Sequence, residues 1–507
     1  MMSFIVGEKE KTSTVHSLFT KIAQKWPNSV AVSSDHDSYT YRELLEASKK
    51  WSGFLARKNI QEQDVIAIIS HRTPELIAAM LGVLFSGGIY TIIDPAWPVD
   101  RVRKLLQTID ARLILGENFF EPLIDSVPLY DIDKIPNFSS FVEDITPSHG
   151  AAIFWTSGST GSPKAVLLPH RAITRLFGSS SPIPIGNGEG IPSIAAVGWD
   201  GFALEVWSQL LSGGKVLIHK DDFFLPHDLV KMIQRGATSA FMTAGLFDIF
   251  IAEEIDCFDG LKSLWVGGDK ISPGSCQKFI TRFPHTPLIN IYGPVECGIF
   301  AASHVINIRD ASSPMVPVGT PTPGTYVTIV RESTVMPRGT QGEIWVSGNA
   351  LACKYVGNNS ETDASFVSAP KGISGDLRDY AWYRTGDEGL ISDEGLLYCT
   401  GRLDRQIKIG GVRVNPAEVE DAAIRAGCVH ACVVPRLCEG EIVGTAMMVV
   451  VNGSVDEKDI RRRIGREIVS QAIPWPIQLV PELPINQNGK VDRLEVQKQL
   501  KNAEYGP

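Results

Sequence analysis

The chain has 507 residues, 44% of them hydrophobic and 21% charged, which excludes a largely disordered protein and calls for more than one domain. Its net charge of -9 argues against nucleic-acid binding as a main role, and no apolar run is long enough to cross a membrane. The eight cysteines lack C-x-x-C pairs and metal-ligand spacing, so we expect reduced thiols and a cytoplasmic location.

Helical and strand patterns alternate along the first part of the chain. Apolar residues recur at helical spacing in some stretches and form short continuous runs in others. Because strands that alternate with helices pair in parallel, the pattern predicts a parallel sheet with helices on both faces. A similar alternation recurs between Gly190 and Ile291. The predicted helices are residues 15–26, 74–86 and 99–109, and the predicted strands are residues 65–69, 89–93, 112–115 and 151–155.

The composition of the sequence changes near Val316. From there glycine and proline become frequent, and short strand-like runs such as residues 342–346 dominate. After Gly401 a smaller unit begins, in which helices and strands are mixed. We therefore predict an α/β protein with a large N-terminal domain over residues 1–403, built of parallel sheets and a small β-barrel-like region. A small α+β domain follows over residues 404–507. Its predicted helices are residues 416–426 and 456–469, and its predicted strands are residues 431–434 and 444–451.

A stretch rich in glycine and hydroxyl groups follows the predicted strand 151–155. Residues 156–164 read TSGSTGSPK and hold two glycines, five hydroxyl-bearing residues and a final lysine. Glycine lets the backbone turn its N–H groups toward an anion, the hydroxyls add donors, and Lys164 adds a positive charge. This composition suits the phosphate tail of a nucleoside triphosphate, and it also occurs in plain linkers. The Walker A pattern does not fit it.

The residue order of this stretch resembles the phosphate-binding signature of the adenylate-forming superfamily. That superfamily contains acyl-CoA synthetases, luciferases and the adenylation domains of nonribosomal peptide synthetases. Residues 39–44 and 87–95 resemble its first two core motifs, which we interpret as structural, and further matches follow in the expected order over nearly the whole chain. The resemblance implies ATP contacts from Thr156, Ser157, Gly158, Ser159, Thr160, Gly161 and Lys164.

Residues 290–296, NIYGPVE, resemble the adenine and metal motif of the superfamily. By this resemblance Tyr292 would stack on the purine, and Glu296 would bind Mg²⁺, a hard cation that prefers carboxylate oxygens. Val295 departs from the usual threonine and lacks its hydroxyl. The implied nucleotide contacts in this motif are Asn290, Tyr292 and Gly293.

Residues 382–387 resemble the ribose motif, in which Asp387 would accept hydrogen bonds from both ribose hydroxyls. Residues 401–408 resemble the hinge motif, with Arg402 as a nucleotide contact and Asp404 as the hinge. In the superfamily the small domain swings about this aspartate, so the resemblance implies a mobile C-terminal domain.

Residues 488–493, NGKVDR, resemble the last motif of the superfamily. Lys490 would be the catalytic lysine that bridges the substrate carboxylate and the α-phosphate, where negative charge gathers during the reaction. The implied catalytic set is Lys490, Glu296 and Lys164.

Residues 198–205 resemble the motif in which amino-acid-activating members hold the substrate ammonium on a buried aspartate, here Asp200. A helix-capping aspartate would give the same pattern. Apart from Asp200 and Lys490, the implied pocket is apolar or glycine, so it favours a small to medium aliphatic side chain such as that of isoleucine or valine. The implied pocket positions are Asp200, Gly201, Leu204, Phe241, Trp265, Gly267, Ile291, Ile299, Phe300 and Lys490.

The resemblance therefore implies a monomeric amino-acid adenylating ligase of nonribosomal peptide synthesis, active in antibiotic biosynthesis, that uses ATP and Mg²⁺. The chain ends seventeen residues after Lys490, so we expect the phosphopantetheinylated carrier protein to act in trans. One alternative is an acyl-CoA or acyl-carrier-protein ligase for a non-amino acid. Another is a catalytically silent nucleotide-binding homologue, supported by Val295 and by Ala165, which replaces the usual glycine after Lys164.

Overall fold

A computed structural model describes residues 4–6, 13–116, 127–132, 145–156, 163–177, 186–221, 223–403, 406–438, 441–451, 456–485 and 491–504. The chain divides into two compact units. The larger unit comprises Met1–Pro95, Thr108–Trp155 and Ala165–Leu403. The smaller unit comprises Ala96–Gln107, Thr156–Lys164 and Asp404–Pro507. Among the described helices, none has both the length and the apolar character needed to cross a membrane.

A seven-stranded sheet in the order β20-β9-β8-β5-β4-β6-β7 forms the first layer of the larger unit. β4 pairs in parallel with β5 and β6, and β5 pairs in parallel with β8, as the alternation of helices and strands predicts. The buried runs expected as strands are all present. The strands are β4 (Val65–Ile69), β5 (Ile89–Ile93), β6 (Leu113–Gly116), β7 (Leu129–Asp131), β8 (Gly150–Thr156), β9 (Lys164–Pro169) and β20 (Lys354–Val356).

Capping residues in the sequence explain where helices of the first half of the chain begin. The Thr40 hydroxyl accepts a hydrogen bond from the Glu43 N–H at 3.3 Å, and the Glu43 carboxylate accepts one from the Thr40 N–H at 2.8 Å, a capping box that starts α2. Pro74 occupies the first turn of α3. The helices are α1 (Val15–Lys25), α2 (Tyr41–Arg57), α3 (Pro74–Phe85), α4 (Val99–Ile109) and α5 (His170–Thr174).

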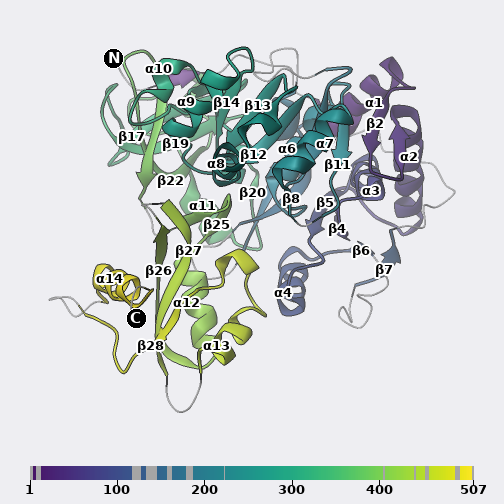
Figure 1. Ribbon diagram of the computed structural model, residues 1–507. Helices are drawn as coiled ribbons and strands as arrows, with labels where there is room; N and C mark the ends of the chain where they lie inside the picture. The colour runs from purple at the N-terminus through teal and green to yellow at the C-terminus, as the bar shows by residue number, and fades with distance from the viewer. Residues whose placement is uncertain are drawn as a thin grey trace. The chain divides into compact units, whose positions relative to one another are not determined.

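The second run of alternating elements, expected between Gly190 and Ile291, forms two further sheets. β10, β11 and β2 pair in parallel and β3 joins them antiparallel. β12, β13 and β14 also pair in parallel and lie side by side in Figure 1, with α8 and α9 packed on them. The strands are β2 (Val30–Ser33), β3 (Ser38–Thr40), β10 (Gly190–Ser193), β11 (Lys215–Ile218), β12 (Ser239–Thr243), β13 (Ser263–Gly267), β14 (Leu288–Tyr292), β15 (Ala302–Val305) and β16 (Thr320–Pro321). The helices are α6 (Asp200–Leu210), α7 (Pro226–Gln234), α8 (Ala244–Glu253), α9 (Pro273–Arg282) and α10 (Ile308–Ala311).

The glycine- and proline-rich region after Val316 forms an antiparallel sheet of seven strands. β17 pairs with β1 and β19, and β22 pairs with β19, β21 and β23. The strands are β1 (Phe4–Val6), β17 (Thr325–Arg331), β18 (Thr334–Val335), β19 (Gly342–Gly348), β21 (Phe366–Val367), β22 (Trp382–Ile391) and β23 (Leu397–Arg402), with helix α11 (Asn359–Ser365) between β20 and β21.

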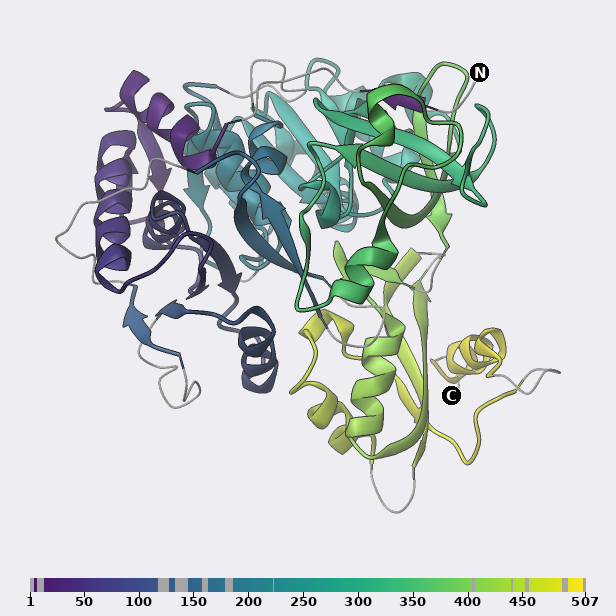
Figure 2. The same ribbon diagram turned by 180° about the vertical axis from the view of Figure 1, so that it is seen from behind.

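The smaller unit is built on the sheet β26-β27-β28. Alternate side chains of its strands point to opposite faces, so Val433 packs with α12 and α13, whereas Val434 packs against Val496 and Leu500 of α14. Figures 1 and 2 show α12 and α14 on opposite sides of the β26–β27 hairpin. The elements are β24 (Ile407–Ile409), β25 (Val412–Val414), α12 (Pro416–Arg425), β26 (Cys428–Cys438), β27 (Glu441–Val451), α13 (Glu457–Ile464), β28 (Ile477–Leu479) and α14 (Arg493–Glu504).

Three elements of this unit differ from the sequence prediction by more than one residue, and one of them is β27, which begins at Glu441 and not at residue 444. The helix expected over residues 456–469 ends at Ile464, because the next residue is Gly465, which lowers helix stability. The strand expected over residues 431–434 extends over Cys428–Cys438, because pairing with β27 continues past Pro435 and the polar Arg436.

Two buried histidines join α1 to α5 in the larger unit. The Nδ1 atom of His170 accepts a hydrogen bond from the Val15 N–H at 3.2 Å. The rings of His16 and His170 pack edge to face, with 5.4 Å between the ring centres. His16 also packs on Phe85, at 5.5 Å between ring centres. Burial lowers the pKa of His16 to about 4 and, with neighbouring histidines, lowers the pKa of His170.

We expect the protein to lose stability as the pH falls from about 6.5 to about 4. The pKa of His16 is lower in the folded chain than its ordinary 6.5, so the unfolded chain binds more protons in this window. The loss through His16 is on the order of 3 kcal/mol. Urea unfolding at several pH values checks it, with His16→Gln expected to flatten the slope and the exposed His36→Gln to leave it unchanged. Equal slopes for the wild type and His16→Gln would contradict this account.

Candidate active site

A hydrogen-bonded group joins β14 to the antiparallel sheet. The Tyr292 hydroxyl donates to the Asp387 carboxylate at 2.6 Å, and the Arg402 guanidinium donates to the other carboxylate oxygen at 2.6 Å. Burial and the neighbouring Asp387 raise the pKa of Tyr292, so the tyrosine keeps its proton and remains a donor. Three residues that the sequence assigns to the nucleotide therefore meet at one place, although 95 positions separate the first two.

Glu296 is fully buried in the short turn Val295–Cys297. Its carboxylate accepts a hydrogen bond from the Tyr355 hydroxyl at 2.8 Å, and its main-chain carbonyl accepts one from the Ala352 N–H at 2.9 Å. The Tyr355 hydroxyl also lies 3.4 Å from that of Tyr383. Sequence reasoning missed Tyr355, because no motif includes it and it comes from β20, at the edge of the parallel sheet.

Asp200 opens α6 and is 6% exposed. The next residue, Gly201, packs so closely that an added Cβ would lie 2.6 Å from the Trp199 ring and 3.0 Å from the Phe241 ring. The rings of Trp199 and Phe241 are 5.8 Å apart. The start of α6 thus lies against an aromatic wall, of which the sequence analysis identified Phe241 and missed Trp199.

The register of the parallel strands brings four of the predicted pocket residues together. Phe241 pairs with Trp265 across β12 and β13, and Gly267 pairs with Ile291 across β13 and β14. Gly267 and Ile291 lie in the carboxyl half of their strands, where ligands of open α/β sheets bind, and Phe241 and Trp265 lie at the middle of theirs. An added Cβ on Gly267 would lie 2.6 Å from Ile291 Cγ1 and 2.7 Å from its carbonyl oxygen. The remaining predicted pocket residues that the structure describes, Leu204, Ile299 and Phe300, are buried in the same cluster of apolar side chains as Phe241 and Trp265.

The buried Glu205 and the half-buried Arg72 fix the segment before Asp200, and neither was assigned from the sequence. The Glu205 carboxylate accepts hydrogen bonds from the N–H groups of Ile194 and Ala195 at 3.1 and 3.0 Å. The Arg72 guanidinium donates to the carbonyls of the same two residues at 2.8 and 3.2 Å. Burial raises the pKa of Glu205 to about 8. This segment leads from β10 into α6, so these bonds set where α6 begins.

Other predicted residues are placed only in part. The hydroxyl of Thr156, at the end of β8, is buried without a hydrogen-bond partner among the described residues, and Lys164 begins β9 at 8% exposure. Asn290 donates to the Pro317 carbonyl at 3.0 Å, and an added Cβ on Gly293 would lie 2.8 Å from the Phe300 Cα. The predicted residues that lie outside the described part of the chain are Ser157, Gly158, Ser159, Thr160, Gly161, Asp404 and Lys490.

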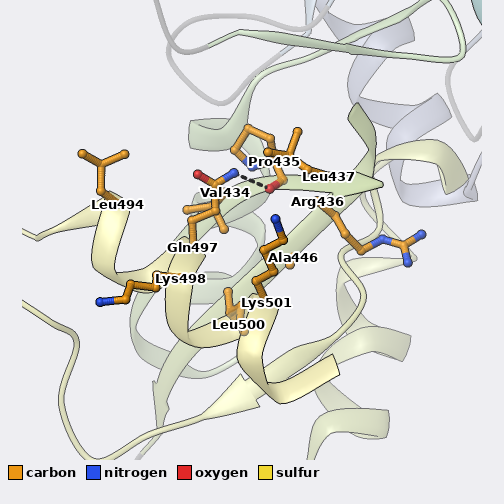
Figure 3. A pocket seen from close by; sticks show the side chains of 10 residues that line it. All are labelled: Val434, Pro435, Arg436, Leu437, Ala446, Leu494, Gln497, Lys498, Leu500 and Lys501. Carbon is orange, nitrogen blue, oxygen red and sulfur yellow. Dashed lines mark hydrogen bonds between the residues drawn. The ribbon is translucent and has the colours of Figure 1, made fainter. Parts of the chain in front are cut away.

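The smaller unit has a pocket of about 220 Å³ between α14 and the β26–β27 hairpin (Figure 3). The Gln497 amide crosses it to donate to the Pro435 carbonyl at 2.9 Å. Of the residues that the sequence assigns to ATP or substrate, none that the structure describes lines this pocket. Its lining residues are Val434, Pro435, Arg436, Leu437, Ala446, Leu494, Gln497, Lys498, Leu500 and Lys501.

The fold is that of solved adenylation proteins. An NRPS protein containing adenylation and PCP domains matches it with a TM-score of 0.88 and 28% identity, covering 96% of this chain and 84% of that chain. The o-succinylbenzoate CoA synthetase of Bacillus subtilis, at 19% identity, matches with a TM-score of 0.83 over 96% of this chain and 99% of that chain, which shows the fold alone. The predicted α/β fold class is confirmed.

The chain belongs to the AMP-binding enzyme family, which residues 19–356 match. Gramicidin S synthase 2 of Brevibacillus brevis is 28% identical over 503 residues, which are 97% of this chain and 11% of that protein. The dimodular nonribosomal peptide synthase of Bacillus subtilis (strain 168) is 30% identical over 507 residues, 96% of this chain and 21% of that protein. The chain thus spans less than a quarter of the length of both relatives. The predicted membership of the adenylate-forming superfamily, with nonribosomal peptide synthetases among the relatives, is confirmed.

We expect Gly267→Ala to destabilise the larger unit by about 1–3 kcal/mol, because the added methyl meets the Ile291 backbone and β13 and β14 must separate. Urea unfolding followed by tryptophan fluorescence measures the change. Gly245→Ala in α8 is the matched control: an added Cβ there meets no atom within 4 Å, and alanine favours a helix. A Gly267→Ala protein as stable as Gly245→Ala would show that the close pairing of β13 and β14 is wrong.

Proposed function

We propose that this adenylate-forming enzyme activates an aliphatic L-amino acid, of the size of valine or isoleucine, with ATP. The observation that carries the amino-acid assignment is Asp200, a carboxylate buried at the start of α6 beside an aromatic wall. A buried carboxylate gains most from a nearby cation, and the α-ammonium of an amino acid supplies one. A fatty or aryl acid has no group that needs this partner.

The nucleotide would bind through the group around Asp387. An ionised carboxylate offers about four acceptor sites, so the bonds from Tyr292 and Arg402 leave room for a ribose hydroxyl. The buried Thr156 hydroxyl, with no partner among the described residues, is a donor for the phosphate tail that would follow strand β8. Lys164, after the glycine- and hydroxyl-rich stretch, would add a positive charge near those phosphates.

A magnesium ion fits the donor set around Glu296. Mg²⁺ is usually held by one or two carboxylates together with substrate phosphates, and the described residues contain no cluster of three or more acidic, histidine or cysteine groups of the kind that forms a full protein cage. The bond from Tyr355 orients the Glu296 carboxylate, whose oxygens are hard ligands of the kind that Mg²⁺ prefers. Bound there, the ion would neutralise charge on the phosphates of ATP.

The side-chain pocket would be formed by the start of α6 together with the middle and the carboxyl half of β12, β13 and β14. Phe241, Trp265 and Ile291 are at most 7% exposed and carry no charge. A charged or amide side chain would lose its water there without gaining a partner, at a cost of roughly 2 kcal/mol or more. One methylene changes affinity by only about 1–3 kcal/mol, so we expect several aliphatic amino acids to be accepted.

In the proposed reaction a carboxylate oxygen of the amino acid forms a bond to the α-phosphorus of ATP, and the bond to the leaving pyrophosphate breaks. Lys490 would stabilise the charge that gathers on the phosphoryl oxygens. A phosphopantetheine thiolate of a carrier protein, supplied in trans, would then attack the acyl carbon and release AMP. Residues 404–507 would act as the domain that brings Lys490 to the substrate, with Asp404 as its hinge.

We expect Asp200→Ala to lower kcat/KM for valine-dependent ATP–pyrophosphate exchange by about a hundredfold or more, because the substrate ammonium loses a buried partner. Exchange with 3-methylbutyrate, which has no ammonium, should stay near its basal rate. Asp228→Ala is the matched control, since Asp228 also lies in the first turn of a helix, α7. Wild-type exchange with 3-methylbutyrate and not with valine would instead indicate a ligase for non-amino acids.

We expect Lys490→Ala to slow pyrophosphate exchange by at least about a hundredfold, while Lys498→Ala on α14 keeps the wild-type rate. The comparison distinguishes an enzyme from a silent homologue, for which Val295 and Ala165 were the only signals. Ala165 lies inside β9, in extended backbone that any residue adopts, so the missing glycine is tolerated. A wild-type protein that binds ATP and exchanges no label with any acid would support the silent homologue.

A further inference from the structure

Arg175 is a fully buried arginine at the end of α5, and no sequence motif singles it out. One terminal nitrogen of its guanidinium, Nη2, donates to three main-chain carbonyls of the turn that follows Glu296. The distances are 3.0 Å to Cys297, 3.1 Å to Gly298 and 2.6 Å to Phe300. Nη2 carries two hydrogens, so at least one hydrogen is shared between two carbonyls, and the positive charge of the guanidinium strengthens the group of bonds as a whole.

The other terminal nitrogen of Arg175, Nη1, ties the guanidinium to the loop before β17. It donates to the hydroxyls of Thr322 and Thr325, the latter at 3.0 Å. The Thr322 hydroxyl in turn donates to the Ala301 carbonyl at 3.0 Å. The arginine therefore holds the turn from one side and is itself fixed by the antiparallel sheet from the other.

The turn that Arg175 holds has an unusual backbone. Gly298 has φ of 68° and Ile299 has φ of 71°, so two consecutive residues adopt the left-handed region. A β-branched residue such as isoleucine rarely adopts it, and such strain persists only where the surroundings impose it. At Gly298 a side chain is also excluded by space, since an added Cβ would lie 2.7 Å from the Ala350 carbonyl oxygen.

Residues of the proposed active site lie immediately before this turn and within it. Glu296 precedes it, and Ile299 and Phe300, two pocket residues, lie within it. Glu296 has its own support from Tyr355 and Ala352, whereas the carbonyls around Ile299 and Phe300 bond to Arg175. Loss of the guanidinium would therefore disturb the pocket wall more than the metal carboxylate.

We propose that Arg175 is a positioning residue: it holds residues 297–300 in the left-handed turn and so sets the shape of the amino-acid pocket. Its functional part rests on the proposed amino-acid activation. It acts through the main-chain carbonyls of Cys297, Gly298 and Phe300, which lie on either side of Ile299, and not by contact with a substrate.

Hydrogen exchange of the ligand-free protein tests the turn without any need for activity. In Arg175→Gln, the amides of residues 297–301 should exchange at least about tenfold faster, while those of β12 and β13 stay as in the wild type. Thr174→Val is the matched control: the Thr174 hydroxyl donates to the carbonyls of Ser13 and His170, away from the turn. Unchanged protection of residues 297–301 in Arg175→Gln overturns the proposal.

If Arg175→Gln does not fold, Thr325→Val decides the question, because it removes one acceptor of the guanidinium and keeps the arginine. We expect faster exchange over residues 297–301 in this variant as well, by a smaller factor. The same protection as in the wild type would again overturn the proposal.

Pyrophosphate-exchange kinetics test the functional part. The KM for valine should rise about tenfold or more in Arg175→Gln, with a smaller change in the KM for ATP, and Arg175→Lys should recover part of the loss. Equal changes in both constants, or no change in the KM for valine, would overturn it. A wild-type protein that exchanges no label with any amino acid would reject the proposed function, while the hydrogen-exchange result would still decide whether Arg175 holds the turn.

Discussion

The parallel pairing of β12, β13 and β14 is the constraint on which the candidate site depends. Because the three strands run in the same direction, their carboxyl halves meet at one edge, and the register brings Phe241 beside Trp265 and Gly267 beside Ile291. A shift of one residue in either strand pair would turn these side chains to the opposite face. β14 ends at Tyr292 and is followed by the turn at Glu296, so the same register also places two residues that the sequence assigns to ATP and its metal.

Polar side chains hold the residues of the candidate site that lie outside the strands. Asp387 is held by Tyr292 and Arg402, Glu296 by Tyr355, and the segment before Asp200 by Glu205 and Arg72. Asp387 and Glu296 are held by other side chains, whereas Glu205 and Arg72 bond to main-chain groups of the irregular segment around Ile194 and Ala195. Such segments lack the ladder bonds of a helix or strand, so buried side chains must satisfy their N–H and C=O groups. The precision of the site comes from these bonds.

The sequence predicted the strands and helices around the parallel sheet well, since continuous apolar runs such as Val65–Ile69 and the proline that starts α3 are local signals. Family motifs also pointed to residues that the structure brings together, including Tyr292 and Asp387. Tyr355 and Arg175 could not be predicted, because an isolated tyrosine or arginine has no spacing to identify it and its value lies in distant partners. The end of α13 depended on a single residue, Gly465, within an otherwise helical pattern.

At Gly201 the proposed pocket cannot be enlarged by substituting a smaller residue. The missing side chain of this glycine is already replaced by the rings of Trp199 and Phe241, and no residue is smaller than glycine. Within the proposed pocket, a longer substrate would have to take its space from the aromatic residues, Phe241 or Trp265. Selectivity in this protein would then evolve, or be redesigned, by replacing aromatic residues of β12 and β13 with smaller ones, while the helix that carries Asp200, the proposed partner of the substrate ammonium, stays unchanged.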